Sequence, residues 1–199
     1  MLKRLQTGVS LIEVMIGIGI LAMLMALGVP QYGIFLANAR LKATADTLVS
    51  GLSLARAEAV KRNARVEMVL TDDDPEEAVV NGLNATLNGP NWMVRQWVPS
   101  TGVYSFIEGK LGGEGSGAAG GRITATSATA SFNGFGGLTT GGAITYNIDN
   151  PSGGACDQAP PATRGPMRCL RVIVSPGGQI RTCDPAVDPV AAPTDTRAC

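Results

Sequence analysis

The segment from Leu11 to Val29 constrains this chain most, because it is almost continuously apolar over nineteen residues. As an α-helix, a segment of this length rises about 28 Å, close to the ~30 Å thickness of the hydrocarbon core of a bilayer. Its one charged side chain is the carboxylate of Glu13. A carboxylate inside a membrane costs at least a few kcal/mol, so it is by default a functional group with a partner. The sequence predicts a transmembrane helix whose acid is paired, and a free amino terminus is the obvious partner.

A short basic leader precedes the apolar run. Lys3 and Arg4 supply its charge, and Gly8 ends it with a small residue. A secretory signal peptide is cut after its apolar core, commonly at a site resembling Ala-x-Ala, whereas the candidate site here precedes the core. Cleavage after Gly8 would leave the apolar helix at the new amino terminus, with the rest of the chain translocated outward. An uncut, single-span anchor is the competing interpretation.

Residues 8–14, read Gly-Val-Ser-Leu-Ile-Glu-Val, resemble the class III signal of type IV prepilins and of type II secretion pseudopilins. The resemblance implies that a prepilin peptidase cuts after Gly8 and methylates the new terminal amine, on Val9. It also implies that Glu13 neutralises that amine on a neighbouring subunit of a fibre. Val9 stands where the family usually has Phe, and its apolar side chain preserves burial. Pro30 matches a helix-kinking proline often found in pilins.

Beyond Pro30 the apolar pattern becomes amphipathic, which predicts that one long helix continues to about Asn63, with a kink near Gly28 and Pro30. Small and apolar side chains recur every three or four residues, while charged side chains fall elsewhere. The apolar positions are Leu41, Ala45, Leu48, Leu52, Ala55 and Ala59. The predicted organisation is a leader over residues 1–8, a transmembrane and filament-core helix over 9–36, and a globular head over 37–199.

The rest of the chain reads as strands rich in β-branched and aromatic residues, separated by glycine, proline and asparagine. The predicted strands are residues 65–71, 92–98, 104–107, 123–132, 143–148, 169–175 and 179–183. A helix followed by strands predicts an α+β fold, in which the helix covers one face of a mainly antiparallel sheet. The glycine-rich segment 112–121 reads as a flexible loop rather than a phosphate site.

Two later patches are similar to those of FimT/FimU-like minor pilins and of the H pseudopilin of type II secretion. They are residues 55–63, Ala-Arg-Ala-Glu-Ala-Val-Lys-Arg-Asn, and residues 174–183, Val-Ser-Pro-Gly-Gly-Gln-Ile-Arg-Thr-Cys. The first patch can also be explained as alternating alanines and charges that simply make a good helix, and residues 72–165 carry no motif that matches.

The resemblance implies a type IV pilin-like fold in a protein that starts in the inner membrane of a Gram-negative bacterium. Its head would lie in the periplasm, and the protein would later join an extracellular pilus. The implied partners are other minor pilins, the major pilin and prepilin peptidase. The favoured hypothesis is a minor pilin of a type IV pilus, a structural subunit that initiates assembly at the tip. An H-type pseudopilin is the alternative.

Four cysteines lie in the last quarter of a chain that the leader predicts to be exported: Cys156, Cys169, Cys183 and Cys199. An even number in an oxidising compartment predicts two disulfides. Pairing Cys169 with Cys183, near the open ends of a predicted hairpin, would leave Cys156 for Cys199. The sequential pairs, Cys156 with Cys169 and Cys183 with Cys199, rank just behind. A zinc site ranks third, because the usual closely spaced cysteine pairs are missing.

The composition argues against an enzyme. The chain contains no histidine, which removes the commonest general base and the commonest transition-metal ligand. It contains no nucleophile-elbow motif, no phosphate-binding loop with lysine and no Cys-x-x-Cys pair. The acids of residues 72–77 read as a solvated turn, because the spacing and glycine of a calcium loop are absent. We therefore expect no catalytic residue, cofactor or metal.

A basic hairpin near the end of the chain could bind DNA. The mature chain as a whole is not basic, because without Lys3 and Arg4 it has 14 basic and 16 acidic residues. Four arginines fall within eighteen acid-free residues: Arg164, Arg168, Arg171 and Arg181. Some FimT-like minor pilins are DNA receptors, and the resemblance implies a Gly-Arg-x-Arg element in this hairpin. Residues 178–181 read Gly-Gln-Ile-Arg and lack the first arginine of this element. The loss of one phosphate contact would weaken binding and lower the slope of log affinity against log salt concentration by about one unit. DNA uptake is therefore a secondary hypothesis, and Trp92 and Trp97 are predicted to be core residues rather than base-stacking ones.

Overall fold

The structure is a computed structural model of the chain. It describes residues 9–112, 121–150, 153–159 and 165–199, and for residues 27–31 it describes the backbone without the side chains. The chain divides into two compact units, residues 1–36 and 37–199.

One long helix, α1 (Leu11–Arg62), confirms the prediction of a helix to about Asn63. It ends there because Asn63 adopts a left-handed conformation, with φ 45°. The backbone N–H of Asn63 donates to the carbonyl of Val60, and that of Ala64 donates to the carbonyl of Ala59. This pair of hydrogen bonds is a Schellman motif, which satisfies carbonyls left free at a helix end.

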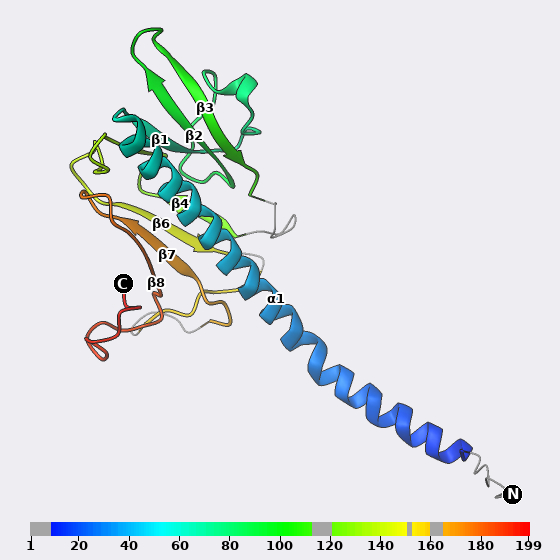
Figure 1. Cartoon of the computed structure of the whole chain (residues 1–199). Helices are drawn as coiled ribbons and strands as arrows, with labels where there is room; N and C mark the ends of the chain where they lie inside the picture. Colours follow the sequence, from blue (N-terminus) through cyan, green and yellow to red (C-terminus); the bar gives the residue numbers. More distant parts are fainter. Residues whose placement is uncertain (1–8, 113–120, 151–152, 160–164) are drawn as a thin grey trace, which may run out of the picture. The chain divides into compact units, whose positions relative to one another are not determined.

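Two four-stranded antiparallel sheets follow in residues 37–199, rather than the single sheet expected (Figure 1). The first has the order β3-β2-β1-β5 and contains β1 (Val66–Thr71), β2 (Asn91–Val98), β3 (Val103–Lys110) and β5 (Thr129–Phe132). The second has the order β4-β6-β7-β8 and contains β4 (Arg122–Ala125), β6 (Ile144–Asp149), β7 (Leu170–Val174) and β8 (Ile180–Cys183). The short helix η1 (Glu77–Val79) lies between β1 and β2 in sequence. The α+β prediction is confirmed.

The single strand predicted over residues 123–132 is wrong. The chain forms β4 in one sheet, bends at Thr126 and Ala128 on either side of Ser127, and forms β5 in the other sheet. The hydroxyl of Ser127 donates to the carbonyl of Thr129 at 2.9 Å, which closes the bend. The segment from Ile123 to Phe132 contains no glycine or proline, and each of its residues is compatible with a strand. The sequence therefore gives no local sign of the bend.

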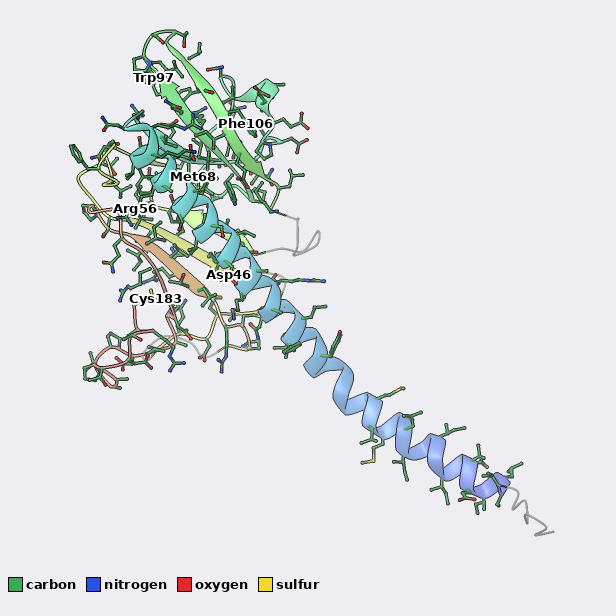
Figure 2. The ribbon with its side chains drawn as sticks, in the orientation of Figure 1. Asp46, Arg56, Met68, Trp97, Phe106 and Cys183 are labelled. Atoms are coloured by element: carbon green, nitrogen blue, oxygen red, sulfur yellow. A yellow bond between two sulfur atoms is a disulfide. The ribbon has the colours of Figure 1, made fainter. Side chains whose placement is uncertain are left out.

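The apolar stripe of α1 packs against both sheets. All six of its predicted positions are at most 1% exposed, and they share one cluster with residues of each sheet, such as Phe132 and Tyr146. Met68 of β1, labelled in Figure 2, belongs to the same cluster. A Cβ on Gly51 would lie 3.0 Å from three atoms of the Trp92 ring, so glycine lets this ring approach the helix closely. Trp92 is 3% exposed, which confirms it as a core residue. The same prediction for Trp97 is wrong, because its ring is only half-buried and packs edge-on against Tyr104 outside the core.

The other face of the first sheet is covered by residues 72–90. Val80 and Leu83 from this segment pack on Val69 and Met93 of the sheet. A buried ion pair lies beside them, because Nε of Arg95 donates to the Glu67 carboxylate at 2.9 Å. The covering segment is tied to the sheet, since the Arg95 guanidinium also donates to the carbonyl of Val80 at 2.8 Å.

Candidate functional site

The first half of α1 presents apolar side chains on all sides. From Leu11 to Met25, the large apolar side chains are between 49% and 78% exposed. A contiguous apolar surface of this kind is used for contact with a membrane or with other proteins. Within the part of the chain that the structure describes, no helix is apolar over a long enough stretch to pass through a membrane.

Glu13 lies in the first turn of α1, where a negative charge interacts favourably with the helix dipole. The turn is closed by the carbonyl of Ser10, which accepts from the backbone N–H groups of Glu13 and Val14 at 3.1 and 3.2 Å. The Glu13 carboxylate is exposed and has no hydrogen-bond or ion-pair partner within the described part of the chain. Gly8 and the side chain of Pro30 lie outside the described residues, so processing at Gly8 and the kink at Pro30 stay predictions.

The basic hairpin brings two of its four arginines together. The register of β7 and β8 pairs Ile173 with Arg181 and Arg171 with Cys183, so Arg171 and Arg181 are diagonal neighbours on one face. Nε of Arg171 donates to the side-chain oxygen of Asn147 on β6 at 2.8 Å. The exposed Arg168 lies in the loop before β7, and Arg164 is outside the described residues.

A further arginine on the same face, Arg122 of β4, was missed by the sequence reasoning. It pairs with Asp149 of β6 through two hydrogen bonds of 2.9 and 2.7 Å. The carboxylate raises the pKa of the Arg122 guanidinium and offsets its charge. The pair could not be found from the local sequence, since its members are 27 residues apart. Arg171 and Arg181 therefore supply the uncompensated positive charge of this face in the described part of the head.

The two disulfides join Cys156 to Cys169 and Cys183 to Cys199, with Cα–Cα distances of 5.4 and 5.2 Å. The favoured pairing of Cys169 with Cys183 is wrong, and the sequential alternative is the one observed. The reason is register, because the residue opposite Cys183 is Arg171 rather than Cys169. A parallel bridge between residues 184 and 198 brings the tail back to the end of β8, where Cys199 meets Cys183. All four cysteines are thus used in disulfides rather than in a zinc site.

The acidic turn forms the rim of a hollow rather than a metal site. The hollow has a volume of about 600 Å³, and its lining residues are Asp73, Asp74, Glu76, Ala78, Val79, Gly82 and Asn84. One oxygen of Asp73 accepts from the backbone and side-chain N–H groups of Asn84 at 2.7 and 3.0 Å. No group of three or more acids, cysteines or histidines in the described ranges could hold a metal ion.

The family model of the type II transport protein GspH matches residues 44–178, and that of the prokaryotic N-terminal methylation motif matches residues 3–29. This chain belongs to the GspH family. No curated protein sequence shows significant similarity to it. The two models together cover the apolar helix, most of the head and the predicted processing site of the GspH-family chain.

Solved structures of minor pilins and pseudopilins are similar to the GspH-family chain. The type IV minor pilin FimU of Pseudomonas aeruginosa is 17% identical, with 74% of this chain and 90% of FimU covered and a TM-score of 0.51. A second crystal form of FimU is 15% identical, with 71% of this chain and 90% of FimU covered and a TM-score of 0.48. The minor pseudopilin EpsH of Vibrio cholerae is 14% identical, with 74% of this chain and 99% of EpsH covered and a TM-score of 0.47. The chain has the type IV pilin fold.

The GspH-family chain is a minor pilin or pseudopilin, of a type IV pilus or of a type II secretion system. Such proteins are structural rather than enzymatic, and they assemble with other pilin-type subunits after processing by a prepilin peptidase. The methylation motif indicates a protein that is anchored in a membrane before it is assembled. None of the comparisons supports DNA binding.

Proposed function

We propose that this GspH-family protein is a minor pilin that joins other minor pilins at the tip of a type IV pilus and initiates polymerisation of the major subunit. The observation that carries the proposal is the first half of α1, an exposed apolar surface with one unpartnered carboxylate near its start. In a fibre this surface would be covered by the helices of other subunits. The head would then carry the contacts that distinguish one neighbour from another.

Glu13 acts in this account as a register device. An acid buried among helices without a partner is destabilising, whereas an acid that meets a terminal amine is paired. After cleavage at Gly8, Glu13 would be the fifth residue of the mature chain, and Val9 would carry the methylated amine. Only one axial position of a neighbouring subunit brings its amine to this carboxylate, so the pair selects a single register.

Two observations bear on the choice between pilus and secretion system. The two disulfides in the last quarter of the chain fit either role, because disulfides persist both outside the cell and in the periplasm. FimU, which shares the fold, is a type IV minor pilin. The family model, which is named for a type II transport protein, favours the second candidate function, an H-type pseudopilin.

Deletion of the gene tests the proposal directly, with twitching motility, DNA uptake and enzyme secretion scored on the same strain. A minor pilin predicts that twitching falls while secretion of folded enzymes continues. Loss of secretion with normal twitching would contradict the pilus role and support the pseudopilin.

The Glu13→Ala variant tests the assembly step. We expect the variant to insert into the membrane but to be missing from sheared fibres, because the neighbouring amine has no acid to meet. Asp46→Ala is the matched control, since Asp46 is an exposed acid farther along the same helix (Figure 2). Normal incorporation of Glu13→Ala would count against the register role.

A DNA contact is a secondary proposal, supported by the shared face of Arg171 and Arg181. Each phosphate neutralised contributes about 0.9 to the slope of log affinity against log salt concentration. The double variant Arg171→Ala/Arg181→Ala is therefore expected to weaken DNA binding at low salt and to flatten this slope. An unchanged affinity at low salt would exclude the hairpin as a DNA site.

A further inference from the structure

An almost fully exposed phenylalanine stands on a hydrogen-bonded turn between β5 and β6. The side chain of Phe135 is 93% exposed. The side-chain oxygen of Asn133 accepts from the backbone N–H groups of Phe135 and Gly137 at 2.9 and 3.1 Å. The backbone N–H of Gly136 donates to the carbonyl of Asn133 at 2.8 Å, and its φ of +79° suits glycine. The turn therefore presents the ring to solvent from a defined backbone.

The turn packs against the last turns of α1. Nε of Arg56, labelled in Figure 2, donates to the carbonyl of Gly136 at 3.2 Å. A Cβ on Gly136 would lie 3.1 Å from the side chain of Val60, so the turn also lies against the exposed side of the helix. A Cβ on Gly178 would collide with the Gly136 carbonyl, so the β7–β8 turn supports it as well. An aromatic side chain on a preorganised backbone loses little freedom on binding, which is typical of an interface hot spot.

The Phe135 patch consists of this ring, two apolar side chains of α1 and the adjoining Arg56. Val60 is 51% exposed, and Ala57 lies exposed one turn earlier on the same face of the helix. A shallow hollow of about 460 Å³ lies beside the turn, and its lining residues are Ser53, Arg56, Ala57, Val60 and Lys61. A partner that docks here therefore meets a projecting ring next to a recess that is partly apolar.

Arg56 supplies the free charge of the Phe135 patch. Its Nε binds a neutral carbonyl, and its two terminal nitrogens have no hydrogen-bond or ion-pair partner in the described part of the chain. The neighbouring cations differ, because Lys61 and Arg62 both donate to Glu58, at 3.0 and 2.6 Å. Those two charges are already compensated within the helix. Arg56 is therefore the cation of this patch that a carboxylate of a partner can meet.

We propose that the Phe135 patch binds the head of a different pilin-type subunit, by inserting the ring into an apolar pocket whose rim carries a carboxylate for Arg56. A projecting ring and a pocket are different surfaces, so the same contact between copies of this chain would repeat into a filament of this chain alone. A minor subunit instead needs a contact that ends at a neighbour of another kind. A lipid surface is a poorer fit, because it attracts clusters of about 4–8 Lys or Arg rather than one free cation. The inference rests on the proposed function, which supplies the subunits of other kinds.

Photocrosslinking in cells tests this contact on the full chain in its own membrane. Phe135 is replaced by p-benzoylphenylalanine, which keeps an aromatic ring at the tip of the turn, and each other pilin-type subunit encoded by the same genome carries its own affinity tag. We expect a covalent product with the head of one tagged subunit, and mass spectrometry should place the crosslink at an apolar residue beside an aspartate or glutamate. A product with a second copy of this chain, with lipid or with the apolar helix of a neighbour would overturn the proposal. The absence of any product would overturn it too.

A charge reversal tests the role of Arg56 separately from the ring. In the chain that carries the photoprobe, Arg56→Glu should lower the yield about tenfold or more, because like charges across an interface repel. Replacing the partner's carboxylate beside the crosslink by arginine should restore the yield, since opposite charges then face each other again. Arg56→Gln keeps an amide group that can donate to the Gly136 carbonyl, so it removes the charge while the turn stays supported, and it should also lower the yield. An unchanged yield in both variants, or no recovery after the charge swap, would overturn the proposal.

A photoprobe at Val190 is the matched control. Val190 is 87% exposed but lies in the carboxy-terminal segment, so it should give no crosslink to the same peptide of the partner. An equal yield from this position would overturn the proposal. Failure of this contact would leave the pilus role intact, because that role is measured by twitching in the gene deletion and by fibre incorporation of Glu13→Ala. Failure of the pilus role would appear there as normal twitching and incorporation, whatever the photoprobe reports.

Discussion

Replacing Arg95 by methionine tests how the acidic segment is held on the head. The Arg95 side chain is 11% exposed, and its partner Glu67 is 2% exposed. Arg95 donates to Glu67 at 2.9 Å and to the carbonyl of Val80 at 2.8 Å, and its guanidinium lies 3.8 Å from the centre of the Tyr104 ring. Methionine fills a similar volume but makes none of these contacts. The Glu67 carboxylate would then keep only Arg65, which is 50% exposed and 3.0 Å away.

The expected loss follows from the burial of the pair. Removing one partner of a buried ion pair costs about 3–5 kcal/mol, because the other charge is left without compensation. Arg65 remains as a second partner, so we expect the lower end for Arg95→Met, about 3 kcal/mol. Replacing both charges by apolar side chains is often neutral. The double variant Glu67→Met/Arg95→Met should therefore be more stable than Arg95→Met alone.

Urea unfolding of the purified chain in detergent, followed by tryptophan fluorescence, measures these changes in the free energy of unfolding. Arg122→Met is the control, because its pair with Asp149 is exposed, at 52% and 28%, and such pairs contribute about 0–1 kcal/mol. A loss below about 1 kcal/mol for Arg95→Met would refute the reasoning. Additive effects in the double variant would also refute it, since they would mean that the two charges do not interact.

Three further changes test other parts of the head. Cys183→Ser removes the disulfide to Cys199, which spans a sequence separation of 16. Urea unfolding should show that the free energy of unfolding falls by about 3 kcal/mol. An unchanged midpoint would argue against a structural role for this disulfide. Hydrogen bonds from Arg197 lower the pKa of Asp195 from 3.8 to about 2, so the stability from this pair is present above pH 4 and is lost as the pH falls towards 2. An NMR titration of Arg197→Ala should show the Asp195 pKa returning towards its ordinary value, and no return would exclude the pair as the cause. Gly178→Ala places a side chain at a φ of +79°, where it would also collide with the Gly136 carbonyl. In the same urea assay it should lower the free energy of unfolding by about 1–3 kcal/mol. A neutral change would contradict the close approach of Gly178 to Gly136.

The helix and its buried face could be predicted from the sequence because their signals are local. Leu48 and Leu52 recur with the helical period, and an asparagine at the helix end suits the left-handed turn found there. The split of residues 123–132 between two sheets could not be predicted. Its bend uses Ser127 and Thr129, which are equally acceptable within a strand, so the division depends on contacts with the rest of the head.

In the candidate site, too, the features with a local sequence signal could be predicted, and those that depend on the folded sheet could not. Glu13 could be found because one acid in an apolar run is a local anomaly. The disulfide pairing depends on the register that places Arg171 opposite Cys183, and this register is a property of the folded sheet. The exposure of Phe135 could not be predicted, because a lone phenylalanine between glycines carries no local sign that its ring faces solvent. Only the packing of Gly178 and of the end of α1 against the turn reveals how firmly it is held.

The mass of the protein purified from cells tests most directly whether this GspH-family chain is a processed subunit. We predict an amino terminus at Val9 that carries one added methyl group, with residues 1–8 absent. Intact-mass measurement with sequencing of the amino-terminal peptide reads both features in one experiment. Retention of Met1, or a terminus at another residue, would contradict the account, because the amine that Glu13 is proposed to meet would then not exist at that position.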